Sequence, residues 1–354
     1  MVHTSDDVLV WVEGAVGRLR LNRPSRLNAL SHEMVKVLRV ALDNWRDDPD
    51  IQCVVIDGAG EKAFCAGGDI AALHAARGSD VKGPSQFWFD QYGLDWTTAN
   101  YPKPYIALMD GIVMGGGAGI SAHGSHRIVT ERTALAMPEC AIGFLPDVGG
   151  TWLLRNAPGQ SGKWIGMTGA RLGAQDAIYT GFADVCVPSD QLPDLVKELV
   201  AGTSIDDLMD RYKVEPSGGC VERYQSVIDQ IFSATTALGS VEALSEFAQN
   251  GKEWAKSSAE NMVRASPFAV TAAFAAHNMA AHMAGLEEAL ALEYRFACNM
   301  WGGHDFFEGI RAMIIDKDKQ PKWQPASFEE VELEDVRRFL TSLPNGKGLI
   351  EFTV

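Results

Sequence analysis

Short apolar runs alternate with helically periodic stretches over roughly the first 190 residues, and this alternation limits the folds open to the chain more than any other feature. Residues 53–56 and 105–109 are apolar runs of strand length, and a glycine-rich turn follows each of them. Residues 128–129 and 185–187 predict two further strands. Buried strands separated by helices are typical of an α/β fold with a largely buried sheet, so we expect that class.

The flanking segments predict how the chain is organised around this sheet. Residues 8–21 alternate apolar positions around Gly14, as a β-hairpin does, and from Met34 a helical spacing continues until Pro49. Beyond about residue 190 the strand signals stop, and helices are predicted over 190–212, 220–234, 240–264, 268–300 and 327–342. We therefore expect a core over 1–195, a helical C-terminal region over 196–325, and a tail helix with its extension over 326–354.

The charge balance limits the partners that the chain can have. It has 31 Lys and Arg against 46 Asp and Glu, a formal net charge of −15. This charge disfavours nucleic acid or an anionic membrane as the general partner, so an anionic ligand must meet a local basic patch. The longest uncharged run, 266–286, contains His277, Asn278 and His282, which favours a packed helix over a membrane span.

The first residues and the cysteines indicate the compartment. The start, "MVHTSDDVLVWVEG", has neither the basic segment nor the apolar run of a targeting peptide, so a cytoplasmic location is expected. Six cysteines are scattered without a C-x-x-C pair, as in proteins with reduced and mostly buried thiols. The eight histidines form no H-E-x-x-H motif, so no metal site is predicted.

Two glycine-rich turns follow two of the predicted strands: "AFCAGGDI" at 63–70 and "GIVMGGGAGIS" at 111–121. Glycine lets backbone N–H groups approach a ligand closely, and a helix that begins just after the turn adds its positive end. Two such turns side by side could hold one oxygen atom. Either turn alone is equally compatible with tight packing, and neither matches a dinucleotide or phosphate-binding motif.

The stretch "MPECAIGFLPDVGGTW" at 137–152 places Glu139 and Asp147 eight positions apart among apolar residues, proline and glycine. A single acid there would be read as a loop-edge residue or a helix cap. For two acids in apolar surroundings, burial and mutual repulsion should raise at least one pKa, which indicates a functional site. His123 and His126 could be catalytic, but they are expected to cap the next strand or satisfy its hydrogen-bonding groups. Ser121 lacks the G-x-S-x-G motif of a hydrolase nucleophile.

Four segments together resemble a known family: "LNRPSRLNAL" at 21–30, "KAFCAGGDI" at 62–70, "MGGGAGIS" at 114–121 and "AMPECAIGFLPDVGGTW" at 136–152. In order and spacing the chain resembles the crotonase (enoyl-CoA hydratase/isomerase) superfamily, and within it the 3-hydroxyisobutyryl-CoA hydrolase branch. The segments "LALEYRF", "HDFFEGIRAMIIDKDKQPKW" and the closing "LIEF" are similar to that branch. The resemblance implies a ClpP-like spiral of ββα units with a helical C-terminal region, acting on acyl-CoA thioesters.

The resemblance also implies catalytic roles. The backbone N–H groups of Gly68 and Gly116 correspond to the oxyanion hole for the thioester carbonyl, where such a donor is worth about 10²–10³ in rate. Hydratases usually carry a first glutamate three positions after the second glycine, where this chain has Gly119. Their second glutamate corresponds to Glu139, and the hydrolase branch adds an acid that corresponds to Asp147. The relocated acid favours hydrolysis over hydration.

Substrate contacts are implied at four positions. In "FWFDQYGLDW" the hydrolase branch often has a second acid just before the tyrosine, where this chain has Gln91, so contacts near the acyl group are expected to differ. Asp69, next to the first oxyanion glycine, is assigned to substrate binding as well. Arg23 and Arg26 are the preferred cations for the adenine end of CoA.

Lys62 and the lysines of "DKDKQPK" complete the expected basic rim, although each of these lysines can equally be an ordinary solvated charge.

The activity implied is that of 3-hydroxyisobutyryl-CoA hydrolase, which releases CoA and 3-hydroxyisobutyrate in valine catabolism. CoA is then part of the substrate, and no separate cofactor is expected. Two alternatives remain open: an enoyl-CoA hydratase or isomerase that uses the same acids, and a non-catalytic acyl-CoA-binding protein. Relatives usually form trimers or hexamers, so a homo-oligomer is expected.

Overall fold

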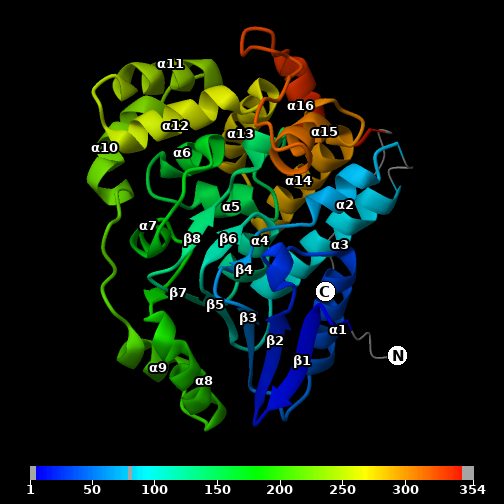
Figure 1. The fold of residues 1–354 in the computed structure, drawn as a ribbon, viewed down its shortest axis with the longest axis vertical. Coiled ribbons are helices and arrows are strands. Elements are labelled where there is room, and N and C mark those ends of the chain that lie inside the picture. Colours follow the sequence, from blue (N-terminus) through cyan, green and yellow to red (C-terminus); the bar gives the residue numbers. More distant parts are fainter. Residues whose placement is uncertain (1–4, 79–81, 345–354) are drawn as a thin grey trace.

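The computed structural model describes residues 5–78 and 82–344 (Figure 1). Two sheets form its centre, one of six strands in the order β1-β2-β3-β5-β7-β9 and one of three strands in the order β4-β6-β8. β1 pairs antiparallel with β2, as the predicted hairpin requires, and every other strand pair is parallel. The strands are β1 Val8–Glu13, β2 Val16–Leu21, β3 Cys53–Gly58, β4 Ala63–Cys65, β5 Tyr105–Met109, β6 Ile112–Met114, β7 His126–Val129, β8 Ala134–Ala136 and β9 Val185–Cys186.

Consecutive strands alternate between the two sheets. β3, β5 and β7 join the larger sheet, while β4, β6 and β8, each only a few residues further along the chain, join the smaller one. A helical segment follows each pair of strands before the chain returns to the larger sheet. The chain therefore winds as a spiral of ββα units, which confirms the α/β crotonase fold expected from the resemblance.

Alternate side chains of the central strands enter two different cores. On β3, Val54 and Ile56 join the main core between the sheets and the C-terminal helices. Cys53 and Val55 point to the opposite face, where they pack with leucines of α8 (Leu192–Val200) and α9 (Ile205–Tyr212). Figure 1 shows α8 and α9 at the lower left, apart from the other C-terminal helices at the top. The central strands of the larger sheet are thus covered on both faces, which explains their nearly continuous apolar sequence, whereas the edge strand β1 is mostly exposed.

The helices cover the sheets and form the C-terminal region. The predicted helix from Met34 is α1, with Ser31 accepting a hydrogen bond from the Met34 N–H at its start. The α-helices not yet bounded are α1 His32–Arg46, α2 Ile70–Ala75, α3 Lys82–Ala99, α4 Gly116–Ala122, α5 Gly150–Arg155, α6 Ser161–Thr168, α7 Ala174–Tyr179, α10 Val221–Phe232, α11 Ala237–Ala248, α12 Glu253–Arg264, α13 Pro267–Ala280, α14 Leu286–Met300, α15 Asp305–Ile310 and α16 Leu333–Thr341.

Three predicted helices are wrong in extent because turns divide them. The segment 190–212 contains a short 3-10 turn at Ser189–Gln191 followed by α8 and α9, and Ser204 caps the second of these helices. The segment 240–264 is divided near Gly251, which has a left-handed backbone with φ +78°. The segment 268–300 is divided before Gly285. In each case the apolar spacing continues across the break, but local turn residues end the helix.

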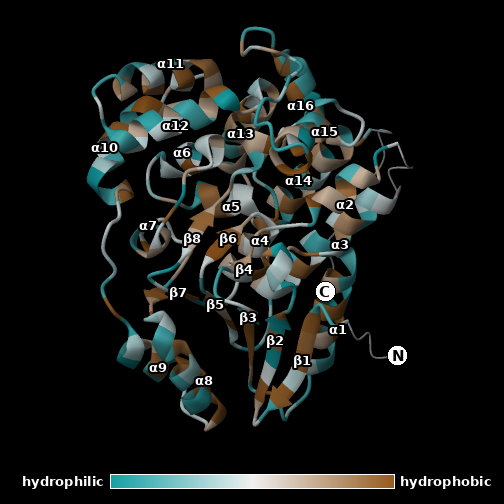
Figure 2. Ribbon diagram, viewed as in Figure 1, coloured by the Kyte–Doolittle hydropathy of each residue, from teal (hydrophilic) through white to brown (hydrophobic). Residues whose placement is uncertain are grey.

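The hydropathy of the elements agrees with this packing. Figure 2 shows apolar residues along the central strands and a mixture of polar and apolar residues along α11 and α12. Residues 267–280 form α13, a packed helix with most of its side chains buried, as predicted for the alanine-rich run. Among the residues that the structure describes, no helix has both the length and the apolar character needed to cross a membrane.

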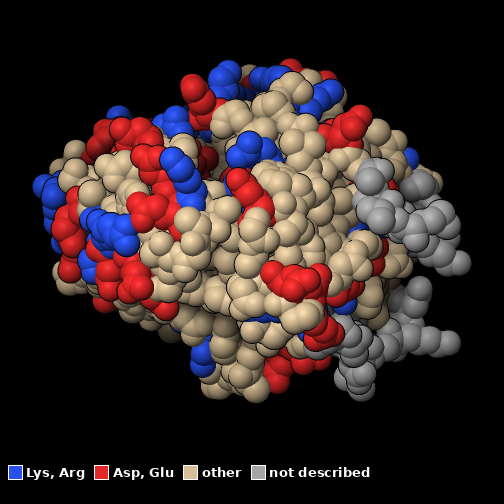
Figure 3. Space-filling view, turned by 90° about the horizontal axis from the view of Figure 1, so that it is seen from below, with Lys and Arg blue, Asp and Glu red and all other residues tan. Residues whose placement is uncertain are grey.

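Charged side chains are mixed rather than separated on the face seen from below (Figure 3). Acidic and basic residues alternate along its margins, and uncharged surface fills much of its centre. Within the described part of this face no broad basic surface is present. The picture agrees with the charge argument against a general nucleic-acid partner.

Candidate active site

A cavity of about 260 Å³ opens where the two glycine turns meet the acidic stretch. β4 and β6 are parallel neighbours in the smaller sheet, so the turns that follow them end at the same edge. Gly68, Gly116, Gln91, Glu139 and Asp147 all line the cavity. Its apolar wall combines aromatic and aliphatic side chains, among them Phe87, Trp88, Phe144, Phe306, Ile70, Leu73 and Ile142.

The two predicted oxyanion glycines lie next to each other. A Cβ atom on Gly116 would be 3.3 Å from the backbone nitrogen of Gly68 and only 2.4 Å from Nε2 of Gln91. The Leu30 N–H donates to the carbonyl oxygen of Gly67, and the Leu30 carbonyl accepts from the Asp69 N–H. Because the Gly67 carbonyl and the Gly68 N–H belong to one peptide group and point in opposite directions, the Gly68 N–H points away from Leu30. Gly116 is the first residue of α4, so its N–H has no partner within the helix. The two amides can therefore serve one acceptor oxygen.

Glu139 is buried at the edge of this pair of amides. It begins a 3-10 turn, Glu139–Ile142, and its side chain is 5% exposed. A Cβ atom on Gly115 would lie 2.9 Å from Oε1, while Oε2 is buried without a hydrogen-bond partner. Burial, and after it the charge of Asp147, raises the pKa of Glu139 well above its usual range. The protonated form of Glu139, which can act as a proton donor, is therefore favoured relative to that of an exposed glutamic acid.

Asp147 has a more polar environment. It is partly exposed to the cavity, and the hydroxyl of Tyr92 donates a hydrogen bond to its Oδ2 at 2.7 Å. Burial raises the pKa of Asp147 to about 6, and the Tyr92 hydroxyl acts in the opposite direction. Above that pH the carboxylate can accept a proton. The two acids predicted from the sequence thus share one cavity, and burial raises the pKa of both, while only Asp147 has a hydroxyl that favours its ionised form.

Three residues near the acids were missed by the sequence reasoning. Tyr92 follows Gln91 on α3, and Asp95 lies one turn further along, 0% exposed, with neither carboxyl oxygen hydrogen-bonded. Glu293 on α14 is also 0% exposed. Burial and the charge of Asp147 raise the pKa of Glu293 to about 8, and burial raises that of Asp95 well above its usual range. Tyr92 and Asp95 belong to "FWFDQYGLDW" and Glu293 to "LALEYRF", segments quoted for their resemblance.

The structure places the four predicted substrate-contact residues differently. Gln91 lies against the oxyanion glycines, whereas Arg23, Arg26 and Asp69 are not among the cavity-lining residues. Nη2 of Arg23 is 3.1 Å from Oδ2 of Asp69, which also caps α2 by accepting the Ala72 N–H. Arg26 is exposed in a 3-10 turn. These three residues remain proposed contacts for the distant part of a ligand.

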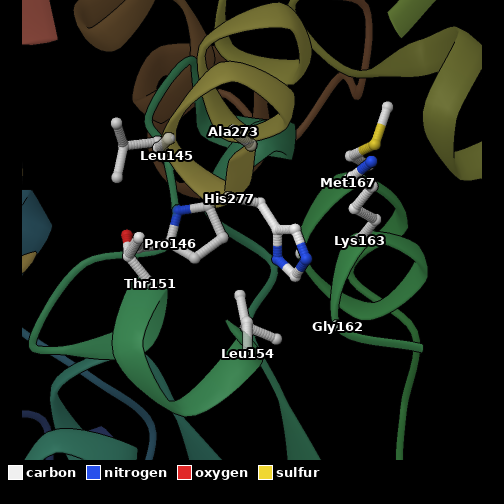
Figure 4. Close-up of a pocket in the computed structure, with 11 residues that line it drawn as sticks. Leu145, Pro146, Thr151, Leu154, Gly162, Lys163, Met167, Ala273 and His277 are labelled. Carbon is white, nitrogen blue, oxygen red and sulfur yellow. The ribbon is translucent and has the colours of Figure 1, made fainter. Parts of the chain in front are cut away.

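A much smaller cavity lies behind the acidic stretch (Figure 4). Its volume is about 10 Å³, room for about one water molecule, and Pro146, Thr151, Lys163 and His277 are among the residues that line it. Burial lowers the pKa of both Lys163 and His277, the latter to about 4. This space is too small for a substrate. The 260 Å³ cavity is the candidate active site because both glycine turns and both acids line it.

Fold and site together define an α/β crotonase-type protein with an amide pair and two acids in one cavity. A family model described as enoyl-CoA hydratase/isomerase matches residues 16–340, and the chain belongs to this family. It is a crotonase-family acyl-CoA enzyme.

Curated relatives resemble the chain along most of its length. The 3-hydroxyisobutyryl-CoA hydrolase, mitochondrial, of Gallus gallus is 38% identical over 349 residues, covering 96% of this chain and 90% of the relative. The Homo sapiens protein of the same name is 37% identical over 349 residues, covering 96% and 89%. Both names place those proteins in mitochondria, so the cytoplasmic location expected here stays a prediction.

Two solved structures are similarly close but have different names. A carnitinyl-CoA dehydratase from Mycobacterium thermoresistibile superposes with a TM-score of 0.92 and 39% identity, covering 98% of this chain and 99% of that one. An enoyl-CoA hydratase from Rhodobacter sphaeroides gives 0.89 and 41%, covering 96% and 98%. The fold is therefore shared by relatives named as hydrolases, dehydratases and hydratases.

Proposed function

We propose that the chain is an acyl-CoA thioester hydrolase acting on a short β-hydroxyacyl-CoA, most specifically 3-hydroxyisobutyryl-CoA. The observation that carries the proposal is the neighbouring amides of Gly68 and Gly116, which share one cavity with Glu139 and Asp147. The identity of 38% to a relative named 3-hydroxyisobutyryl-CoA hydrolase supports the choice of acyl group. The product acid and free CoA are the expected products.

In the proposed reaction the thioester carbonyl accepts hydrogen bonds from the two glycine amides, which stabilise the oxyanion of the tetrahedral intermediate. Glu139 either attacks the carbonyl carbon, giving a mixed anhydride, or assists water. We favour the route through water, because the raised pKa of Glu139 disfavours the carboxylate that would have to attack, whereas Asp147 is ionised above about pH 6 and can take the proton from water. Glu139, with its raised pKa, can then protonate the departing thiolate.

A thiol-trapping assay with a panel of hydroxyacyl-CoA thioesters tests the proposal. The purified full chain should release free CoA, and Glu139→Gln should nearly abolish release while the urea-unfolding midpoint stays close to that of the wild type. Retained turnover in Glu139→Gln would remove Glu139 from the mechanism. Tight binding of acyl-CoA with no turnover would instead support a non-catalytic binding protein.

A second candidate is a dehydratase or hydratase, favoured by the names of the two solved structures at 39% and 41% identity. Asp147 would then take the role of the first glutamate of hydratases, since this chain has Gly119 at the corresponding position. Hydration changes the absorbance of an enoyl thioester without releasing thiol, whereas hydrolysis releases thiol. Measuring both signals on the same samples therefore separates the two reactions.

A further inference from the structure

The turn that carries Asp147 has an unusual backbone. Val148 has φ +58° and Gly149 has φ +75°, so two consecutive residues are left-handed. Glycine adopts this conformation easily, but for a β-branched residue such as Val148 it is an outlier. Strained backbone of this kind persists only where its surroundings hold it, and it concentrates at functional sites.

Two buried side chains hold this turn. Glu293 accepts hydrogen bonds from the Gly149 N–H at 2.7 Å through Oε2 and from the Thr151 N–H at 2.9 Å through Oε1. His123 contributes Nε2, which is 2.9 Å from the carbonyl oxygen of Val148. Glu293 lies on α14, which packs against both α3 and α5. Both carboxyl oxygens of Glu293 thus accept hydrogen bonds from the backbone next to Asp147, although Glu293 lies more than 100 positions further along the sequence.

The same turn fills the place where hydratases carry their first glutamate. A Cβ atom on Gly119 would lie 2.7 Å from Cβ of Val148 and 2.6 Å from Oδ1 of Asp95. No side chain fits at position 119 while the turn keeps this conformation. Besides Glu139, the acid of the cavity is therefore Asp147 on the turn itself, and its position depends on how the turn is held.

We propose that Glu293 is a positioning residue for Asp147: its two carboxyl oxygens hold the left-handed turn and so fix the acid that faces the cavity. The inference rests on the proposed role of Asp147 in the reaction. Glu293 does not line the cavity and acts through the turn rather than on the substrate. Glutamine cannot replace it, because one of two acceptor oxygens would become an NH₂ group facing a backbone N–H donor.

A double-mutant cycle tests the proposal with the full chain. Glu293→Gln should lower kcat by about 10–100-fold with a smaller change in KM, because a displaced catalytic group loses rate without losing binding. In the Asp147→Asn background the same change should lower kcat by less than about twofold, since the positioned acid is already gone. An equal loss in both backgrounds would overturn the proposal and leave Glu293 a purely structural residue.

Asp176 offers a matched control. It is also buried and accepts the backbone N–H groups of Cys220 and Val221, but it lies away from the cavity. Asp176→Asn should lower the unfolding midpoint and leave the kcat of the folded protein unchanged. If Glu293→Gln does not fold, the cycle is run with Glu293→Asp, which keeps the carboxyl group and shortens the reach.

Hydrogen exchange separates failure of this inference from failure of the proposed hydrolysis. The Gly149 and Thr151 amides should be protected in the wild type and should exchange at least tenfold faster in Glu293→Gln. Unchanged exchange would refute the inference even if thiol release is normal. Absence of thiol release in the wild type would refute the hydrolase assignment, and the cycle would then be measured through hydration.

Discussion

Gly116 and Gly117 are adjacent in α4, and adding one methyl group to each should have opposite consequences. A Cβ atom on Gly116 meets the far end of Gln91, at 2.4 Å from Nε2, and lies 3.3 Å from the Gly68 nitrogen. The Gln91 side chain can move aside, so the methyl group should be accommodated. It would then occupy the space where the substrate oxygen must approach both amides.

The expected loss in Gly116→Ala is therefore catalytic. Blocking one oxyanion donor costs about 2.7–4 kcal/mol of transition-state stabilisation, a fall of about 10²–10³ in kcat. Stability should change little, because alanine in a helix gains about 0.5–1 kcal/mol over glycine and offsets part of the repacking of Gln91.

Gly117→Ala is the matched control. Its Cβ atom would lie 2.3 Å from the carbonyl oxygen of Cys65, and this backbone oxygen belongs to β4 and cannot rotate away. Overpacking of this kind costs about 1–3 kcal/mol. The free energy of unfolding should fall, while the folded fraction keeps most of its activity.

Both variants are measured by urea unfolding and by turnover of the best thioester substrate, with rates normalised to folded protein. The reasoning is refuted if Gly116→Ala keeps its wild-type kcat. It is also refuted if Gly116→Ala is the less stable of the two. The contact of a Cβ atom at position 117 with the Cys65 backbone would then cost less stability than the contact at position 116 with the Gln91 side chain.

Three further outcomes follow from the charges of the site. The acid limb of the pH profile of kcat/KM should lie near pH 6, and Tyr92→Phe should move it to higher pH, because the lost hydroxyl favours ionised Asp147; an unmoved limb would contradict this. Burial raises the pKa of Asp95, so its stabilising contribution is complete below about pH 4, the unfolded pKa, and is lost as the pH rises. Asp95→Asn should therefore gain stability over the wild type between pH 4 and neutral pH in urea titrations, and a constant difference would argue against a raised pKa. Arg26→Ala should raise KM for CoA thioesters several-fold but not for pantetheine thioesters, which lack the nucleotide; equal effects on both would exclude a phosphate contact.

Local signals in the sequence predicted much of the fold. The hairpin, the first helix and the central strands were predicted because their apolar periodicity extends over several turns or strand residues. β4 and β6, with three residues each, lie inside the two stretches predicted as glycine-rich turns and were therefore missed as strands, and β8 was missed as well. The divided helices were predicted as continuous because apolar spacing is compatible with a break that only the turn residues reveal.

For the site, local features of the sequence predicted the two glycine turns and the acids Glu139 and Asp147, while the family resemblance assigned the oxyanion role to Gly68 and Gly116. The sequence did not predict the contact between Tyr92 and Asp147, which are 55 positions apart. Such contacts depend on how α3 packs against the acidic stretch, and a pattern of neighbouring residues contains no information about that packing.

The sequence by itself determined the α/β class, the two glycine turns and the two acids, since these follow from local periodicity and short motifs. Only the tertiary structure decided that the turns meet at one edge of a sheet, that burial raises the pKa of both acids, and that Glu293 accepts hydrogen bonds from the turn that follows Asp147. The reason is physical: backbone propensity acts between near neighbours, whereas burial and electrostatic coupling depend on distances that exist only after the chain has folded.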